Sequence, residues 1–317
     1  MQLKSDRPTA LVTGSAGFIG RHMCAELLSR GYDVTRIDRR ENTCPPEDAR
    51  TVFAECSTLV DPRQRFDLVV HCAYLVGGRA TIDNEHGAMA YNVELDSRLF
   101  AWAKRTGQRR VLYFSSSAVY PTSLQIVEKA GLFPRLHEGL QGDFEEIGRP
   151  DAAYGFAKLV GEQLAREARK CGLPVTVVRP FSGYGSDQGL EYPFPAFVDR
   201  AAMRCNPFVI WGHSEQRRDW IHVDDVVRGA LAVADSGTEL PVNLCMGRGT
   251  SMITLASMIC AKAGYSPRFK VDVNAPYGVF NRVGDPSRML EHYTPRVILG
   301  EGIERAFATR KSGESHV

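Results

Sequence analysis

Tyr154 and Lys158 lie four residues apart in the segment 152–171, which has the pattern of an amphipathic helix. This spacing places both side chains on one face of the helix. A phenol is a poor base at neutral pH, but a neighbouring ammonium or other positive charge favours the phenolate. The pair is therefore suited to removing a proton from a substrate hydroxyl, and Lys158 could also hold a ribose. An exposed helix pair of no chemical role is the alternative, because this spacing is common by chance.

Three hydroxyls follow a predicted buried strand at 110–115. Ser115, Ser116 and Ser117 come where that strand ends. In open α/β sheets, ligands bind outside the carboxyl ends of the strands. One serine there would often make only turn hydrogen bonds, but serines together with a tyrosine–lysine pair and a glycine loop indicate a reaction site.

A glycine loop lies near the start of the chain. Gly14, Gly17 and Gly20 stand between an apolar strand at 9–13 and a predicted helix at 18–30. A strand that turns tightly into a helix presents backbone N–H groups and the positive end of the helix dipole, which suits a pyrophosphate. The glycines allow the turn, the approach of the phosphate and close helix packing. The loop predicts a bound dinucleotide.

The second predicted strand, at 33–37, is followed by Asp38, 18 positions past Gly20. An acidic residue at this place hydrogen-bonds the adenosine ribose, so Asp38 favours NAD. Arg39 and Arg40 follow, and a guanidinium could receive a 2′-phosphate instead, which leaves NADP open.

Composition excludes several classes of protein. The 317 residues are 44% hydrophobic and 24% charged, with a formal net charge of +2. Basic residues are scattered, which argues against a nucleic-acid partner. The eight cysteines show no zinc-ligand spacing, so we expect reduced thiols and no metal site. With no apolar run of membrane-spanning or signal-peptide length, we expect no membrane association and a cytoplasmic location.

Apolar strand-like runs alternate with helical ones up to about residue 180, as in a parallel sheet covered on both faces. We therefore predict an α/β fold, a Rossmann-type doubly wound parallel sheet with a smaller, mixed C-terminal region. Residues 1–180 would bind NAD(P), with a return segment at about 220–250, and residues 181–317 would mainly bind substrate. The expected strands are 9–13, 33–37, 51–54, 67–71, 110–115, 174–179, 208–211 and 241–245, and the expected helices are 18–30, 85–106, 152–171, 195–204, 225–235 and 251–263.

Taken together, these motifs resemble those of the extended short-chain dehydrogenase/reductases, in particular the NAD-dependent nucleotide-sugar epimerase/dehydratase family. The resemblance covers nearly the whole chain. Within the family, the chain looks most like GDP-mannose 3,5-epimerase, GDP-fucose synthase and the UDP-sugar 4-epimerases. It rests on the loop at 13–20, Asp67 to Ala73, Asn92, Ser115 to Tyr120, Tyr154 with Lys158, Arg179-Pro180, Tyr184-Gly185, Arg218 to Asp225 and Arg282 to Asp285.

The resemblance implies transient oxidation of a sugar carbon of a nucleotide-diphosphate sugar by NAD, in a homodimer formed by the helices at 85–106 and 152–171. It makes Ser116, Tyr154 and Lys158 catalytic. It assigns cofactor binding to Gly14, Gly17, Phe18, Ile19, Gly20, Asp38, Arg39, Ala73 and Lys158. It assigns substrate binding to Arg79, Ser117, Ser182, Arg218 and Arg282, with the two arginines at 218 and 282 on the diphosphate.

Within the family, the resemblance favours 4-epimerisation. Ser117 and Ala118 stand where 4,6-dehydratases carry an Asp-Glu pair, and Ala118 also replaces the cysteine of the 3,5-epimerases. Removal and return of one hydride needs no further acid or base. A GDP-sugar 3,5-epimerase and an NADPH-dependent 4-ketoreductase remain alternatives, and a dehydratase or a non-catalytic NAD(P)-binding module is less favoured.

Some residues stay open to two interpretations. Ser182 replaces an asparagine that is usual in the family. The long connection at 121–150 could cap the sugar and supply a carboxylate, or could be an ordinary surface insertion; its acids are Glu138, Asp143, Glu145 and Glu146. His71 and His222 are more simply explained as structural residues.

Overall fold

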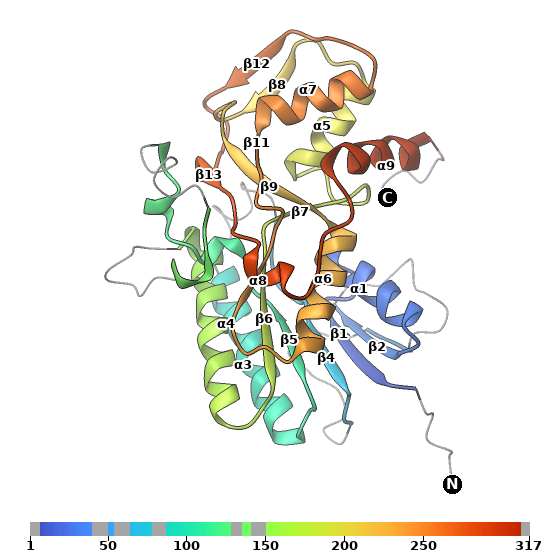
Figure 1. Ribbon diagram of the computed structural model, residues 1–317, viewed down its shortest axis with the longest axis vertical. Helices are drawn as coiled ribbons and strands as arrows, with labels where there is room; N and C mark the ends of the chain where they lie inside the picture. The colour runs from blue at the N-terminus through green and yellow to red at the C-terminus, as the bar shows by residue number, and fades with distance from the viewer. Residues whose placement is uncertain are drawn as a thin grey trace.

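A seven-stranded parallel sheet forms the centre of the computed structural model, which describes residues 7–39, 50–53, 64–77, 87–127, 135–140 and 150–311. The strand order is β10-β6-β5-β4-β1-β2-β3, and Figure 1 shows the part from β6 to β2. Apart from β10, this is the order of the Rossmann fold, so the predicted fold class is confirmed. The strands are β1 (Thr9–Thr13), β2 (Asp33–Asp38), β3 (Arg50–Phe53), β4 (Leu68–His71), β5 (Val111–Phe114), β6 (Val175–Pro180) and β10 (Val242–Leu244).

Helices cover both faces of this sheet. Helices α1 (Phe18–Ser29) and α6 (Val223–Ser236) pack with Ala10 and Val12 of β1 in one apolar core. Helices α3 (Ala88–Thr106) and α4 (Ala152–Lys170) pack with Leu11 in a second core. Side chains alternate between the faces of a strand, which explains why neighbours in β1 belong to different cores. All residues of β4, β5 and β6 are buried, as expected for parallel strands covered on both sides.

The chain beyond β6 builds two smaller sheets above the carboxyl ends of the central strands (Figure 1). One sheet is mixed and contains β7 (Ser182–Tyr184), β9 (Arg217–His222), β11 (Gly249–Ser251) and β13 (Asn281–Arg282). The other pairs β8 (Phe208–Trp211) with β12 (Phe269–Asp272). They pack with α5 (Pro193–Ala202), α7 (Met252–Lys262) and α9 (Leu299–Lys311), while α8 (Ser287–Leu290) is a single turn near β10.

Several features of this second region differ from expectation. Strand β9 was not predicted, because its Arg217-Arg218-Asp219 start lacks an apolar alternation, and β13 is only two residues long. The helix expected at 225–235 begins at Val223, since His222 caps it by accepting a hydrogen bond from the Asp224 N–H.

Within the described ranges no helix combines the length and hydropathy needed to cross a membrane. Six cysteines lie in these ranges, and all are free thiols.

A buried ion pair joins α4 to the strands on which it packs. The Arg179 guanidinium donates two hydrogen bonds to the Glu162 carboxylate, Nε to Oε1 at 2.8 Å and Nη2 to Oε2 at 2.6 Å. Ser115 donates to the same carboxylate, and Arg179 Nη1 donates to the Tyr120 hydroxyl at 3.1 Å. The side chains of Arg179 and Glu162 are 0% and 3% exposed. Neither charge has water to replace a lost partner.

We expect Arg179→Met to lower the free energy of unfolding by about 3–5 kcal/mol, because Glu162 would stay buried without its counter-charge. Denaturant unfolding followed by circular dichroism measures the change. The double variant Arg179→Met/Glu162→Met should recover most of the loss. Glu94→Gln, which breaks the exposed pair Glu94–Arg98 on α3, is the control and should cost under about 1 kcal/mol. An equally small effect of Arg179→Met would contradict the expectation.

Candidate active site

The glycine loop joins β1 to α1 at the carboxyl end of the sheet. Gly14 has a φ of +70°, and a Cβ there would lie 2.6 Å from the Ala73 nitrogen, so this place requires glycine. A Cβ on Gly20 would overlap the Gly14 carbonyl. Gly17 caps α1 and offers no side-chain acceptor to the first-turn N–H groups, which begin at Phe18 and Ile19. The loop therefore presents backbone donors at the positive end of α1.

Asp38 ends β2 beside this loop. Its carboxylate accepts a hydrogen bond from the Ala16 N–H at 2.9 Å, and the residue is 6% exposed. The contact fixes the acid against the turn that carries Gly14 and Gly17. Arg39 follows Asp38 on the surface, whereas Arg40 lies outside the described residues.

The structure brings Ser116, Tyr154 and Lys158 together at the carboxyl end of β5. Ser116 precedes the short 3-10 helix η1 (Ser117–Val119), and its hydroxyl accepts from the Ala118 N–H at 3.1 Å. Tyr154 lies in the first turn of α4 and hydrogen-bonds the Ser116 side chain. Lys158, one turn later, is buried and its Nζ donates to the Phe114 carbonyl at 2.6 Å.

Gly155 explains why these residues can meet. A Cβ at this position would overlap the Ala118 carbonyl oxygen, so only glycine lets α4 approach η1 so closely. The same carbonyl accepts a hydrogen bond from the Asp151 N–H at 2.9 Å, which holds the start of α4 against the turn after β5. Glycine between Tyr154 and Lys158 is thus part of the geometry that places Tyr154 beside Ser116.

Two arginines lie on neighbouring strands of the mixed sheet, since Arg218 on β9 and Arg282 on β13 are paired in register. Arg282 Nε donates to Gln125 Oε1 at 2.7 Å, and its Nη2 donates to Asp151 Oδ2 at 2.8 Å. Arg282 is also close enough to Tyr154 to lower the pKa of its phenol. Arg218 Nη1 donates to the Arg217 carbonyl at 2.8 Å.

Of the other three residues expected to bind substrate, the structure describes two. Ser182 begins β7 and is half-buried, and Ser117 is buried in η1. Arg79 lies outside the described residues.

Comparison with known proteins establishes the family. The model of the NAD dependent epimerase/dehydratase family matches residues 10–245 of this chain. The chain belongs to this family. Across 306 residues it is 31% identical to the dTDP-4-dehydro-6-deoxy-D-allose reductase of Streptomyces sp, covering 89% of this chain and 90% of the relative. It is 28% identical to GDP-mannose 3,5-epimerase 1 of Oryza sativa subsp. indica, covering 94% of this chain and 80% of the relative.

Solved structures agree with this family assignment. MoeE5, in a complex with UDP-glucose and NAD, is 27% identical, superposes with a TM-score of 0.81 and covers 97% of this chain and 100% of its own. A UDP-glucose 4-epimerase of Thermotoga maritima, at 24% identity and a TM-score of 0.81, shares the fold over 96% of this chain and 100% of its own. The similar proteins include a reductase and epimerases, so membership of the epimerase/dehydratase family does not by itself select the reaction.

Sequence reasoning missed the residues that hold Arg282 in this epimerase/dehydratase-family protein. Gln125 is fully buried, and its amide nitrogen donates to the carbonyls of Tyr120 and Pro121 at 3.0 Å and 3.1 Å. No pattern marks such a glutamine. Asp151 has a visible signal, because an aspartate directly before a helix often caps it, but here its carboxylate pairs with Arg282 instead of capping α4.

The long connection contributes to the protein interior through Glu138. The Glu138 carboxylate accepts from the Asn243 N–H of β10 at 3.0 Å and lies 3.7 Å from Arg288. It therefore fastens the connection to β10. Asp143, Glu145 and Glu146 lie outside the described residues, so the predicted cap over the sugar stays a prediction.

Both histidines have structural partners. His71 is buried, with Nδ1 2.6 Å from the Thr13 hydroxyl and Nε2 3.0 Å from Asp96 Oδ1. His222 caps α6, and burial lowers the pKa of its imidazole.

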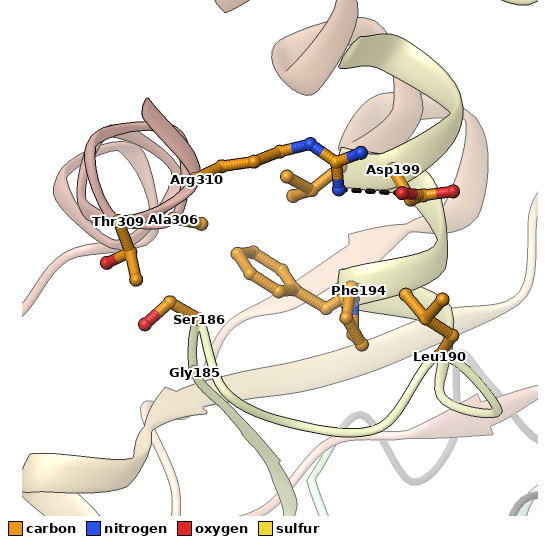
Figure 2. A pocket seen from close by; sticks show the side chains of 10 residues that line it. Gly185, Ser186, Leu190, Phe194, Asp199, Ala306, Thr309 and Arg310 are labelled. Carbon is orange, nitrogen blue, oxygen red and sulfur yellow. Dashed lines mark ion pairs between the residues drawn. The ribbon is translucent and has the colours of Figure 1, made fainter. Parts of the chain in front are cut away.

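A separate cavity of about 330 Å³ lies between α5, α9 and the segment after β7 (Figure 2). The Arg310 guanidinium spans it to Asp199 at 2.6 Å. None of the residues predicted for cofactor, substrate or catalysis lines this cavity. Its lining is Gly185, Ser186, Leu190, Phe194, Pro195, Val198, Asp199, Ala306, Thr309 and Arg310.

Burial dominates the electrostatics of the site. It raises the pKa of Tyr154, and the Ser116 hydrogen bond and the Arg282 charge oppose that rise. Burial lowers the pKa of Lys158 to about 8, although the nearby Asp96 carboxylate favours the ammonium. Without cofactor, Tyr154 is therefore a protonated phenol at neutral pH, and it needs an additional positive charge nearby to become a base.

The titration of Lys158 gives a prediction for stability. Its pKa of about 8 lies below the ordinary value of 10.5, so the unfolded chain binds more protons than the folded protein between these pH values. Relative to Lys158→Met, the free energy of unfolding should be level below pH 8 and rise by about 3 kcal/mol towards pH 10.5. Denaturant unfolding across this range measures it. Lys104→Met, on an exposed part of α3, is the matched control. A wild-type advantage that falls with pH would refute the expectation.

Proposed function

We propose that this protein is an NAD-dependent nucleotide-diphosphate-sugar 4-epimerase that works through a transient 4-keto sugar. The observation that carries the proposal is the meeting of Ser116, Tyr154 and Lys158 at the sheet edge that also holds the glycine loop. These groups can move a proton on and off one hydroxyl, and nothing more is needed when a hydride leaves a carbon and returns to its other face.

The residues around the glycine loop fit NAD. Gly14, Gly17 and Gly20 leave room where a Cβ would meet backbone, and α1 starts with uncapped donors suited to a pyrophosphate. Asp38, fixed beside the loop, would hold the adenosine ribose, with Phe18, Ile19, Arg39 and Ala73 lining the site. When bound, NAD would accept the hydride from the sugar and give it back.

The side chains of this chain would handle the proton. Tyr154 would take it from the sugar hydroxyl as general base and return it as general acid, while Ser116 donates a hydrogen bond to the same oxygen. Lys158 would keep the phenol acidic and hold the nicotinamide ribose. Arg218 and Arg282 would grip the diphosphate, a task suited to guanidinium groups, with Ser117, Ser182 and Arg79 nearer the sugar.

The residues after Ser116 favour epimerisation over elimination. Ser117 carries no charge, and Ala118 is 4% exposed and apolar, so this turn offers no acid–base pair to expel water and no thiol to exchange a ring proton. The proton chemistry is then confined to Tyr154. The homodimer through α3 and α4 and the assignment of residues 181–317 to substrate binding stay predictions.

A 4-ketoreductase is the second candidate. It is supported by the 31% identity to a dTDP-4-dehydro-6-deoxy-D-allose reductase and by the two arginines after Asp38, which suit a 2′-phosphate. A reductase would use the same three catalytic residues but would release its oxidised cofactor.

Solvent deuterium separates these reactions. The protein is incubated in D₂O with UDP-, dTDP- and GDP-hexoses, and products are followed by NMR. We expect inversion at C4 with no deuterium on the ring carbons, because the hydride comes from the sugar itself. Deuterium at C3 and C5 would show a 3,5-epimerase. Turnover of a 4-keto sugar that consumes NADPH in stoichiometric amount would show a reductase.

Tyr154→Phe should lower turnover by about 10²–10⁴-fold, because it removes the proton acceptor, while cofactor stays bound. Turnover is measured by NMR of the sugar product, and mass spectrometry of the nucleotide released on denaturation tests whether cofactor stays bound and distinguishes NAD from NADP. Tyr32→Phe, at the residue that directly precedes β2, is the matched control and should keep full activity. Full activity of Tyr154→Phe would remove Tyr154 from the mechanism.

A further inference from the structure

Tyr74, three residues after the end of β4, touches both Tyr154 and Lys158, yet neither the glycine loop nor the serine motif points to it. The Lys158 Nζ lies 3.2 Å from the centroid of the Tyr74 ring, directly over its face. The same ring packs edge-on against Tyr154, with centroids 5.8 Å apart and planes at 86°. Tyr74 is therefore in contact with the proposed base and with the lysine proposed to lower its pKa.

Asp96 holds the hydroxyl end of the Tyr74 side chain. The Tyr74 hydroxyl donates to Asp96 Oδ2 at 3.4 Å. Asp96 on α3 is fully buried and is itself held by the Tyr113 hydroxyl at 2.7 Å and by His71 Nε2 at 3.0 Å. Burial and the Asp96 charge raise the pKa of Tyr74, so its ring stays a neutral phenol.

The ring matters because the Lys158 ammonium is buried and needs partners within the protein to replace its hydration. It has three N–H donors. Among the described residues, the Lys158 Nζ donates to the Phe114 carbonyl and lies over the face of the Tyr74 ring, and a further donor would be available to a ribose hydroxyl. The negative face of an aromatic ring stabilises a desolvated cation. Tyr74 thus offsets part of the burial that otherwise favours the uncharged amine.

We propose that Tyr74 is a positioning residue which holds the Lys158 ammonium charged and beside Tyr154, with Asp96 fixing the ring. The proposal rests on the 4-epimerase assignment for its use in turnover, but the contact itself does not. Without the ring, Lys158 loses its charge more readily, and Tyr154 then ionises only at higher pH.

Other groups face these two side chains and contribute to their titration. Around Lys158 they are Asp96 from α3, Cys72 after β4, Tyr113 from β5 and Glu162 from α4. Around Tyr154 they are Ser116, Arg282, Asp96 and Tyr192. Replacing Tyr74 also removes its hydrogen bond to Asp96, but Tyr74→Phe and the other Tyr74 variants share that loss, so a comparison among them isolates the ring.

The ionisation of Tyr154 can be measured without any sugar. The NAD-saturated protein is titrated with base while the ultraviolet absorbance of tyrosinate is recorded, and the same titration of a Tyr154→Phe version of each variant is subtracted. Tyr74→Leu should raise the Tyr154 midpoint by up to about one pH unit, because the cation–π contact acts on Lys158 and affects Tyr154 only through the charge of Lys158. Tyr74→Phe, which keeps the ring, should raise it much less.

Isosteric variants guard against a fold defect. Tyr74→pentafluorophenylalanine keeps the size of phenylalanine but removes the negative ring face, so it should shift the midpoint like Tyr74→Leu even if the latter fails to fold. Tyr32→Leu controls for the loss of a packed aromatic ring and should leave the midpoint in place. Equal midpoints for Tyr74→Phe and Tyr74→pentafluorophenylalanine would overturn the proposal. The epimerase assignment is tested separately, by the deuterium experiment.

Discussion

The close seating of α4 on the carboxyl end of β5 is the constraint on which the rest of the site depends. Two glycines on this helix permit it: a Cβ on Gly155 would overlap the Ala118 carbonyl, and one on Gly161 would overlap the Tyr113 hydroxyl and the Asp96 carboxylate. Because the helix approaches so closely, Tyr154 reaches Ser116 and Lys158 reaches the Phe114 carbonyl. A small increase in this separation would break both contacts at once.

Close packing also removes water from the charged groups inside the site, which costs free energy of desolvation. Lys158, Glu162 and Asp96 are all withdrawn from water between α3, α4 and β5. Each is compensated locally: Glu162 by the two-pronged contact of Arg179, Asp96 by His71 and Tyr113, and Lys158 by a carbonyl and an aromatic face. Satisfied networks of this kind fix side chains in one arrangement. The surroundings of the proposed catalytic residues are thus held in one arrangement by contacts within the protein.

Much of this architecture could be predicted from the sequence. The buried strands read as apolar runs, and the glycine loop, Asp38, the serines after β5 and the tyrosine–lysine pair each follow from local spacing that one element dictates. The partners of Arg282 and Lys158 could not be predicted, because Gln125, Asp151 and Tyr74 meet them only through the packing of distant segments. The strands β9 and β13 were missed for a related reason: their pairing is made by tertiary contacts, and their residues carry no alternation.

The ion pair between Arg282 and Asp151 is one of the contacts that join the small mixed sheet to the central part of the molecule. Arg282 belongs to the small mixed sheet, whereas Asp151 is the residue from which α4, and with it Tyr154, begins. An anionic substrate bound to Arg282, as proposed, would therefore also act on the first turn of the helix that carries Tyr154. In such an arrangement, binding energy from the diphosphate, which does not react, would help to align Tyr154 with the sugar hydroxyl, which does.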